Sequence, residues 1–386
     1  MEQTIIIIGN TGEAVRYLQE SLTKISYNPG LIDGIFGSKT ELAVKSFQTD
    51  KRLISDGIVG NNTWTAIEKA LASLFTIKDF FPIKANTQYV YVYEGKGSDY
   101  ASYSIFIDYL IGNLIQLRHH DGGMDLVRVL ENKDGKLTML LSRESDYREN
   151  FMNIPSSNSE ILIQEPLIKG TTWTLADNRK RYISNMEANV TTPLGNYKAL
   201  EVTTEGINAK TLDYYAQNIG LIKTVSTSNG SEISSSLSKI ENNALFTQFA
   251  EFYYPNIDEH TLHYVLKQLT FKTNDITRTV IEIAYKAVPI GDIFKTLGPN
   301  AKIKSLYLNK DTFAYVDFSK EIISEMNTGS GYEVQVLQCI TNTIGRYYSV
   351  TNIVFTVEGI PYASGHVLFE KDEAFVVDLS LSTPLE

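Results

Sequence analysis

Few residues in this 386-residue chain have the type and spacing that metal catalysis needs. The five histidines are His119, His120, His260, His263 and His366. A catalytic zinc needs about three convergent ligands. His260 and His263 lie three residues apart beside Glu259, which is not the H-E-x-x-H spacing that places two ligands on one helix face. His119-His120 beside Asp121 offers no third histidine nearby. We therefore expect no catalytic metal and no cofactor.

Nucleophiles and acid–base pairs are equally scarce. The single cysteine, Cys339, lies in a segment with helical apolar spacing, where buried structural thiols are common. The sequence has no G-x-S-x-G nucleophile elbow. The 45 Asp and Glu residues nevertheless leave a two-carboxylate hydrolase open. The residues favour a protein that is not an enzyme, with a carboxylate-dependent hydrolase as the alternative.

A repeated polar turn is the most informative pattern in the sequence. The pattern D-G-I-x-G-x-x-T occurs at residues 33–40 and again at 56–63. Aspartate hydrogen-bonds nearby backbone, glycine adopts positive φ, and Ser, Asn or Thr caps a following helix. Each copy therefore predicts a tight turn that leads into a helix.

Three helices must position these turns. The apolar residues recur at helical intervals in each predicted helix. The first helix opens at a capping box formed by Asn10 and Glu13. The others start at about Ser38 and Asn62. The apolar positions are Val15, Leu18 and Leu22, then Leu42, Val44 and Phe47, then Trp64, Ile67 and Leu71. The run Ile5–Ile8 is interpreted as a short strand.

Residues 10–70 resemble the peptidoglycan-binding domain 1 family. The resemblance rests on separate elements that occur in order: Gly12-Glu13-Ala14-Val15, Leu18-Gln19, Asp33-Gly34, Phe36-Gly37, Thr40, Ala43-Val44, Phe47-Gln48 and Thr63-Trp64. It implies a three-helix module, residues 1–73, that binds cell-wall peptidoglycan in a shallow groove near the turns and helix starts.

The candidate ligand-binding residues are polar turn groups and aromatic faces. They are Tyr27, Asp33, Gly34, Phe36, Asp56, Gly57 and Trp64. Aromatic faces and polar turn groups suit a glycan with peptide stems. A second interpretation stays open, because aromatic residues such as Phe36 and Trp64 are more often core side chains, and the two aspartates can simply brace their turns.

Residues 74–245 change to an alternating pattern. Segments such as Tyr89–Tyr93, Ser104–Asp108, Glu160–Gln164, Lys198–Val202 and Gly220–Val225 alternate between apolar and polar residues. Turn signals separate the strands at Gly95, Gly97, Gly122-Gly123 and Asp134-Gly135. The pattern predicts a large antiparallel sheet, sandwich or open barrel with no helix needed. A filled interior is favoured over a ligand cavity.

The same middle region resembles β-rich lipoprotein-like domains of Firmicute envelopes. The residues that carry this weaker resemblance are Phe81-Pro82, Pro166–Trp173, Thr192–Tyr197, Tyr214-Tyr215-Ala216 and Gly220–Lys223. The resemblance brings no ligand with it. The polar stretch Ser226–Ser238 is interpreted as the approach to a domain boundary near residue 245.

Residues 246–386 predict an α+β sandwich. A strand runs through Ala250–Asn256, a helix through Asp275–Lys286, and Leu297-Gly298-Pro299 stops a helix. A hairpin joins Ile303–Leu308 to Thr312–Phe318 around Asn309-Lys310-Asp311. A final amphipathic helix after Gly329-Ser330-Gly331 has Leu337, Ile340, Ile344 and Tyr347 on one face, and strands follow around Asn352–Val357 and the Glu358-Gly359 turn.

This C-terminal region resembles the GerMN domain of sporulation and spore-germination proteins. The matching residues are Tyr254-Pro255, Leu297-Gly298-Pro299, Ala314–Ser319, Gly331-Tyr332-Glu333, Thr341-Asn342-Thr343 and Val354–Gly359, while residues 286–297 depart from the family pattern. The resemblance implies a ring-building-type fold used in assembly, with no catalytic constellation. Self-association, or contact with other spore-envelope proteins, follows as an expectation.

The composition of the chain limits which kinds of binding partner and compartment we expect. A net charge of −10 disfavours nucleic acid, and a single cysteine allows no internal disulfide. No segment approaches the ~20 apolar residues of a membrane span. The start also lacks a signal-peptide pattern, so we expect either a trimmed sequence or delivery without a signal, as by assembly around a forming spore.

Together, these features predict a multidomain protein of the cell wall or spore envelope. We expect a three-helix module, then a mainly antiparallel β domain, then an α+β ring-building-type domain, acting as a peptidoglycan-binding adaptor in sporulation or germination. The first alternative is a carboxylate-dependent cell-wall hydrolase with its active site in the middle domain. The second is a first module that has lost its ligand and mediates protein contacts, which replacement of Asp33 and Trp64 would distinguish.

Overall fold

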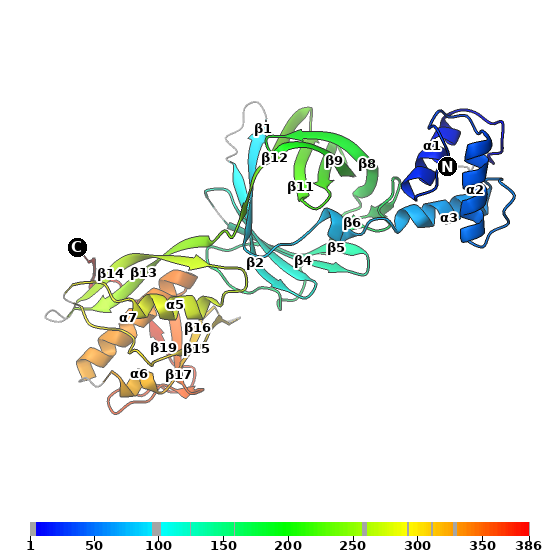
Figure 1. Ribbon diagram of the computed structural model, residues 1–386. Helices are drawn as coiled ribbons and strands as arrows, with labels where there is room; N and C mark the ends of the chain where they lie inside the picture. Colours follow the sequence, from blue (N-terminus) through cyan, green and yellow to red (C-terminus); the bar gives the residue numbers. More distant parts are fainter. Residues whose placement is uncertain are drawn as a thin grey trace.

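The computed structural model describes residues 5–94, 102–123, 125–157, 159–256, 261–291, 293–309, 312–326 and 330–385. Three units follow one another along the chain: a group of helices, a large antiparallel sheet, and an α+β unit (Figure 1). The multidomain fold class predicted from the sequence is confirmed. Several predicted features lie outside the described residues, namely Gly95, Gly97, Glu259, His260, Lys310, Asp311 and Gly329.

The N-terminal unit holds three helices around one core. They are α1 (Glu13–Lys24), α2 (Ser38–Asp50) and α3 (Asn61–Ala72). The core consists of the apolar face of each helix together with residues of the two turns: Ile6, Val15, Leu18, Leu22, Phe36, Ala43, Val44, Phe47, Val59, Trp64 and Ile67.

Two local predictions in this unit are wrong. The N-cap of α1 is Gly12, which has no side chain to cap the helix. The Asn10 Oδ1 instead accepts a hydrogen bond from the Ile7 backbone N–H at 2.9 Å, so its amide is used within the preceding turn. That turn also ends the Ile5–Ile8 segment early, and Ile6 makes a single β-bridge with Val59 in place of a strand.

The middle unit is one curled sheet preceded by a single helical turn, α4 (Ile77–Phe80). Among the described residues the sheet has twelve antiparallel strands in the order β6-β5-β4-β3-β2-β1-β12-β11-β10-β9-β8-β7. The strands are β1 (Thr87–Glu94), β2 (Tyr103–Ile111), β3 (Leu114–His120), β4 (Asp125–Lys133), β5 (Lys136–Glu144), β6 (Glu160–Gln164), β7 (Thr172–Thr174), β8 (Lys180–Thr192), β9 (Gly195–Gly206), β10 (Ala209–Ala216), β11 (Gly220–Ser228) and β12 (Ser231–Asn242).

Side chains connect the two ends of this sheet. The Ile161 carbonyl on edge strand β6 accepts hydrogen bonds from Trp173 Nε1 at 3.0 Å and Arg181 Nη1 at 2.6 Å. Arg181 Nη2 also donates to Glu160 at 2.7 Å. Because the sheet curls until β6 meets β7 and β8, residues from both halves share one apolar core. Of the three forms that the alternation left open, the curled sheet corresponds to the open barrel, and side-chain hydrogen bonds connect its edge strands β6 and β7.

One prediction for the middle unit is wrong. The interior is not filled, because the curled sheet surrounds a cavity of about 450 Å³. Polar side chains such as Arg128 and Asp213 point to this inner face, where they interrupt the close packing that an apolar interior would allow. The serine-rich stretch Ser226–Ser238, after which a boundary near residue 245 is predicted, belongs to β11 and β12, and β12 ends at Asn242.

The C-terminal unit packs helices against two small sheets. Its helices are α5 (Thr277–Lys286), α6 (Glu321–Ser324) and α7 (Ser330–Tyr348). Its strands are β13 (Phe246–Pro255), β14 (Leu262–Phe271), β15 (Ile303–Leu308), β16 (Ala314–Phe318), β17 (Asn352–Val357), β18 (Ile360–Pro361), β19 (Ala374–Val376) and β20 (Ser382–Pro384). The sequence did not predict β19 or β20.

Helix α7 connects the parallel strands β16 and β17, as crossover connections between parallel strands usually do. The Leu297-Gly298-Pro299 motif does not stop a helix, because α5 already ends at Lys286. Leu297 is instead buried in the main core of the unit and anchors the loop that follows α5.

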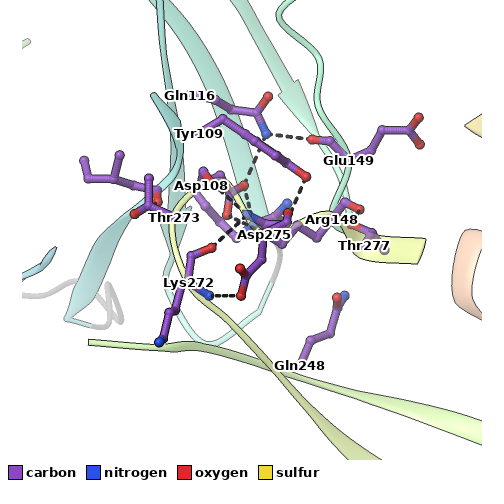
Figure 2. Close-up of polar contacts among 12 residues, drawn as sticks. Asp108, Tyr109, Gln116, Arg148, Glu149, Gln248, Lys272, Thr273, Asp275 and Thr277 are labelled. Carbon is purple, nitrogen blue, oxygen red and sulfur yellow. Dashed lines mark hydrogen bonds and ion pairs between the residues drawn. The ribbon is translucent and has the colours of Figure 1, made fainter. Parts of the chain in front are cut away.

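A buried polar network joins the β domain to the C-terminal unit (Figure 2). Asp108 on β2, Arg118 on β3 and Arg148 all have fully buried side chains. Arg118 Nε donates to Asp108 Oδ2 at 3.0 Å, and the Arg148 guanidinium lies 3.4 Å from Asp108 Oδ1. Arg148 also donates to the carbonyls of Lys272, at 3.2 Å, and Asp275, which connect β14 to α5. The two units therefore share an interior.

Candidate functional site

Two buried glutamines organise the repeated turns of the N-terminal unit. Gln19 Nε2 on α1 donates to Asp33 Oδ1 at 3.0 Å, to the Ile35 carbonyl at 3.1 Å and to Thr40 Oγ1 at 3.3 Å. Its Oε1 accepts from the Gly34 N–H at 2.8 Å. One side chain thus fixes the whole first D-G-I turn and the start of α2.

Gln48 on α2 repeats this arrangement at the second turn. Its Nε2 donates to Asp56 Oδ1 at 2.9 Å, to the Ile58 carbonyl at 2.9 Å and to Thr63 Oγ1 at 3.1 Å. Its Oε1 accepts from the Gly57 N–H at 2.9 Å. The module therefore contains two copies of one unit, which we call the glutamine–turn unit: a helix-borne glutamine, an Asp-Gly turn, and the threonine of the next helix.

The predicted glycines are required by the backbone of each turn. Gly34 has φ +75° and Gly57 has φ +78°. A Cβ on Gly57 would lie 2.9 Å from Glu41 Cγ and from Lys45 Cε. A larger residue there would be strained in backbone conformation and would also displace its neighbours.

The predicted aspartates hold the turns through one oxygen each. Asp33 Oδ1 accepts from Gln19 and from the Ile35 N–H at 2.9 Å, and these bonds lower the pKa of its carboxyl. Asp56 Oδ1 accepts from the Ile58 N–H at 2.8 Å and from Gln48, with the same effect on its pKa. Both carboxylates are exposed and stay ionised at neutral pH. Each can therefore hold its turn through Oδ1 and still offer Oδ2 to a ligand.

A groove of about 440 Å³ opens at the second turn. It is lined by exposed apolar residues and by the start of α3: Ile5, Gln48, Leu53, Ile54, Asp56, Ile58, Gly60, Asn61, Asn62 and Thr63. Ile54 is 81% exposed and Ile5 is 65% exposed. Gly60 is the N-cap of α3 and provides no side-chain cap. An apolar rim beside backbone N–H groups at a helix start can accept a molecule with both apolar and acidic or carbonyl groups.

The three predicted aromatic residues are placed differently from one another. Phe36 is 1% exposed and lies in the core, which is the second interpretation that the sequence left open. Trp64 is 6% exposed and stacks on the half-exposed ring of Tyr17 at 5.8 Å. Tyr27 is partly buried, donates to Asp50 Oδ2 at 2.7 Å, and has its pKa raised to about 12 by burial and by this hydrogen bond. Of the seven predicted site residues, Asp56 lines the groove.

Sequence reasoning missed the glutamines and most of the groove. A signal was present, because an apolar residue followed by glutamine precedes each turn, as Leu18-Gln19 and Phe47-Gln48. The exposed Ile54 had no such signal, since a single apolar residue in a loop is common. The predicted ligand contacts of the other residues stay predictions.

The residues considered for catalysis lie apart from one another. Cys339 is buried in α7, and burial raises the pKa of its thiol. His263 contacts the Asn256 amide at 2.8 Å, whereas His119 stacks on Tyr103 at 4.1 Å inside the β domain. Within the part of the chain that the structure describes, His, Cys, Asp and Glu form no group of three that could hold a metal ion. In the same part, no helix is long and apolar enough to cross a membrane.

Comparison with known proteins identifies two of the three units. Residues 11–67 match the family model described as "Putative peptidoglycan binding domain", and residues 251–363 match the model "Sporulation and spore germination". The chain carries a peptidoglycan-binding module and a GerMN-type domain. The resemblances found in the sequences of the N-terminal and C-terminal units are thereby confirmed.

An uncharacterised protein of Kitasatospora aureofaciens is 43% identical over 60 residues, which are 15% of this chain and 51% of that protein. The chain thus spans about half the length of this curated relative. Among solved structures, the SleB N-terminal domain is 35% identical and covers 18% of this chain and 93% of its own, with a TM-score of 0.17.

Two further solved structures are similar to parts of this chain. The first GerMN domain of GerM from Bacillus subtilis is 18% identical, covers 33% of this chain and 96% of its own, and has a TM-score of 0.26. A "Putative Lipoprotein from Clostridium perfringens" is 21% identical, covers 34% of this chain and 87% of its own, and has a TM-score of 0.23.

Proposed function

We propose that this protein is a non-catalytic adaptor that binds peptidoglycan in the cell wall or spore envelope through the groove of its first module. The observation that carries the proposal is the match of residues 11–67 to the peptidoglycan-binding family, on a module whose second glutamine–turn unit forms a groove. The sporulation family match of residues 251–363 supports a role in spore assembly or germination.

The groove, and not the first turn, is the proposed binding site. Leu31 and Ile54 both stand two residues before the aspartate of their turn, and they are 80% and 81% exposed. Ile54 lines the groove together with Asn61 and Asn62 of α3. The amide groups of these asparagines can hydrogen-bond glycan hydroxyls and peptide amides, while Ile54 packs against apolar faces.

The equivalence of Leu31 and Ile54 gives a matched test. In co-sedimentation with purified peptidoglycan sacculi, Ile54→Glu in the full chain should lose at least tenfold in affinity, because a charged side chain replaces the apolar wall. Leu31→Glu carries the same change at the first turn and should bind like the parent protein. Equal binding by both variants would refute the groove, and loss by Leu31→Glu alone would move the site to the first turn.

The same suspension tests the absence of catalysis. We expect sacculi to pellet with the protein while no soluble muropeptide is released and turbidity stays constant. Release of fragments by the full chain would replace the adaptor with the carboxylate-dependent hydrolase. If the protein does not sediment with sacculi at all, the result would support an N-terminal module that contacts another protein and not peptidoglycan.

The C-terminal domain is the proposed assembly part of the adaptor. Phe249 on β13 and Leu266 on the neighbouring strand β14 are 60% and 64% exposed. Such apolar side chains on adjacent strands are suited to contact a second copy or another envelope protein. Light scattering of the full chain should show a mass above the 43.3 kDa monomer, and a monomer at all concentrations would refute self-association.

A further inference from the structure

The interior of the β domain contains a cavity that the proposed wall-binding function does not use. Its volume of about 450 Å³ is within the range of small-molecule binding sites. Strands from both halves of the curled sheet line it, together with the segment Phe81-Pro82-Ile83 that follows α4. The Asn218 N–H donates to the Asp79 carbonyl at 2.7 Å, which holds α4 against the turn between β10 and β11.

Most of the cavity wall is apolar or aromatic. Ile105, Leu117, Leu130, Met139, Leu162 and Leu221 contribute aliphatic surface. Tyr91, Tyr103 and His119 form a continuous stack along one side, with ring centroids 4.8 Å and 4.1 Å apart. Polar side chains such as Asp213, Thr224 and Ser235 interrupt this largely apolar wall, so the cavity suits a mainly apolar body that carries a polar group.

The charged groups of the cavity are unequally satisfied. Arg181 is fully engaged by Glu160, Thr204 and the Ile161 carbonyl. Arg128 differs, because its Nε atom is buried and has no hydrogen-bond partner in the described part of the chain. The His119 Nδ1 atom is buried and unpartnered in the same way. A guanidinium is a donor only and remains charged, so a buried one requires an acceptor.

Arg128 is the cation of the cavity that can pair with a ligand, because the other titratable groups are neutral or already hydrogen-bonded. Burial and the neighbouring Arg128 lower the pKa of His119 to about 4, so its ring is neutral at pH 7. Asp213 accepts from Thr224 Oγ1 at 2.7 Å, and burial raises the pKa of its carboxyl, against the opposing effect of the nearby Arg181 and Arg128. Glu160 is already paired with Arg181 at 2.7 Å.

We propose that this cavity binds a long-chain carboxylic acid. The apolar chain lies along the aliphatic and tyrosine walls, and the carboxylate accepts a hydrogen bond from the unpartnered Arg128. An ion pair in this low-dielectric interior is stronger than at the surface, and the occupant provides the acceptor that the guanidinium lacks. The β domain is therefore a carrier of a lipid-derived acid attached to the wall-binding module.

The test uses the full chain and cis-parinaric acid, an 18-carbon carboxylic acid that fluoresces when removed from water. We expect saturable binding of one molecule per chain and displacement by palmitate. Hexadecanol, which has a similar chain but no charge, should displace the probe at least tenfold less well. Absence of saturable binding to the folded protein, or equal displacement by palmitate and hexadecanol, would overturn the proposal.

Variants distinguish binding of the ligand's carboxylate from binding of its hydrocarbon tail. Arg128→Met replaces the guanidinium with an apolar side chain of similar length. It should lower the affinity for palmitate at least tenfold and leave the affinity for hexadecanol unchanged. Arg52→Met removes the same charge from an exposed position of the N-terminal module and should change neither. Leu130→Trp fills the cavity and should reduce binding of both, provided that its melting curve shows a folded chain. An Arg128→Met variant that binds palmitate like the parent would contradict the assigned head-group site.

Discussion

The two junctions of this chain are built in opposite ways. Between the N-terminal module and the β domain, four residues, Ser73–Thr76, connect α3 to α4. An ion pair between Lys24 and Glu187 at 3.2 Å crosses this junction, with side chains 44% and 58% exposed. Between the β domain and the C-terminal domain, Asp108, Arg118 and Arg148 are fully buried, and Arg148 donates across the boundary to the carbonyls of Lys272 and Asp275.

This difference separates a tethered module from a rigid pair of domains. Small, polar contacts between domains permit relative motion, whereas a desolvated network must break as a whole. The Arg148 guanidinium also lies over the rings of Tyr109, at 4.3 Å, and Phe271, at 4.8 Å, one from each domain. We infer that the N-terminal module can reorient relative to the rest of the chain, while the β domain and the C-terminal domain move together.

The largest expected effect comes from Asp108→Asn at the rigid junction. The substitution keeps the shape but leaves two buried arginines without their shared carboxylate, and breaking a buried ion pair from one side costs about 3–5 kcal/mol. Denaturant unfolding followed by tryptophan fluorescence and circular dichroism should show this loss, with the two domains unfolding in separate transitions.

The matched control for that experiment is Asp146→Asn. Asp146 is exposed close to the same junction, and its side chain has no role in the network. Its stability should stay within about 0.5 kcal/mol of the parent protein, as for most surface substitutions. If Asp108→Asn unfolds in one unchanged transition, the network does not couple the domains.

Sequence patterns predicted local structure in both halves but not the rigid junction. The alternation along β3 places Ile115 and Leu117 on the inner face, and it equally places Gln116 and Arg118 on the outer face, as in a sheet with one solvated side. On that outer face Arg118 is buried, because it donates to the carbonyls of Ser145 and Tyr147 and lies 4.9 Å from the ring of Phe246 in the C-terminal domain. Alternation reports which residues share a face and cannot report what covers that face.

The same limit explains the outcome at the two candidate sites. The D-G-I turns were predictable because their conformational requirements are local. Gln19 meets Asp33 only after α1 and the turn have packed, and periodicity does not distinguish a filled barrel from one that encloses a cavity beside Arg128. Long-range placement, not residue type, was the missing information.

An intermediate effect is expected from Glu149, which lies at the rigid junction. Its side chain is partly buried and burial raises its pKa to about 7. The folded state therefore holds a proton that the unfolded state releases near pH 4.5, so this group contributes stability at low pH that is lost as pH rises from about 4.5 through 7.

Glu149→Gln replaces the protonated form with a neutral isostere. At pH 4 the variant and the parent should have equal free energies of unfolding. At pH 8 the variant should be more stable by about 3 kcal/mol, because the parent must then bury a charged carboxylate. Urea titrations at the two pH values measure this difference. A variant that is less stable at pH 8 would show that the ionised carboxylate has a partner at the junction.

The smallest effect should come from Lys24→Gln at the tethered junction. Both partners of the Lys24–Glu187 pair are exposed, and such pairs contribute less than about 1 kcal/mol, decreasing as salt screens them. We expect the free energy of unfolding to change by less than about 0.5 kcal/mol, and sedimentation with sacculi to be unchanged. Lys69→Gln, an exposed change on α3, provides the comparison. A loss of more than about 1 kcal/mol for Lys24→Gln alone would mean that the module is fixed to the β domain, and the contrast between a mobile and a rigid junction would fail.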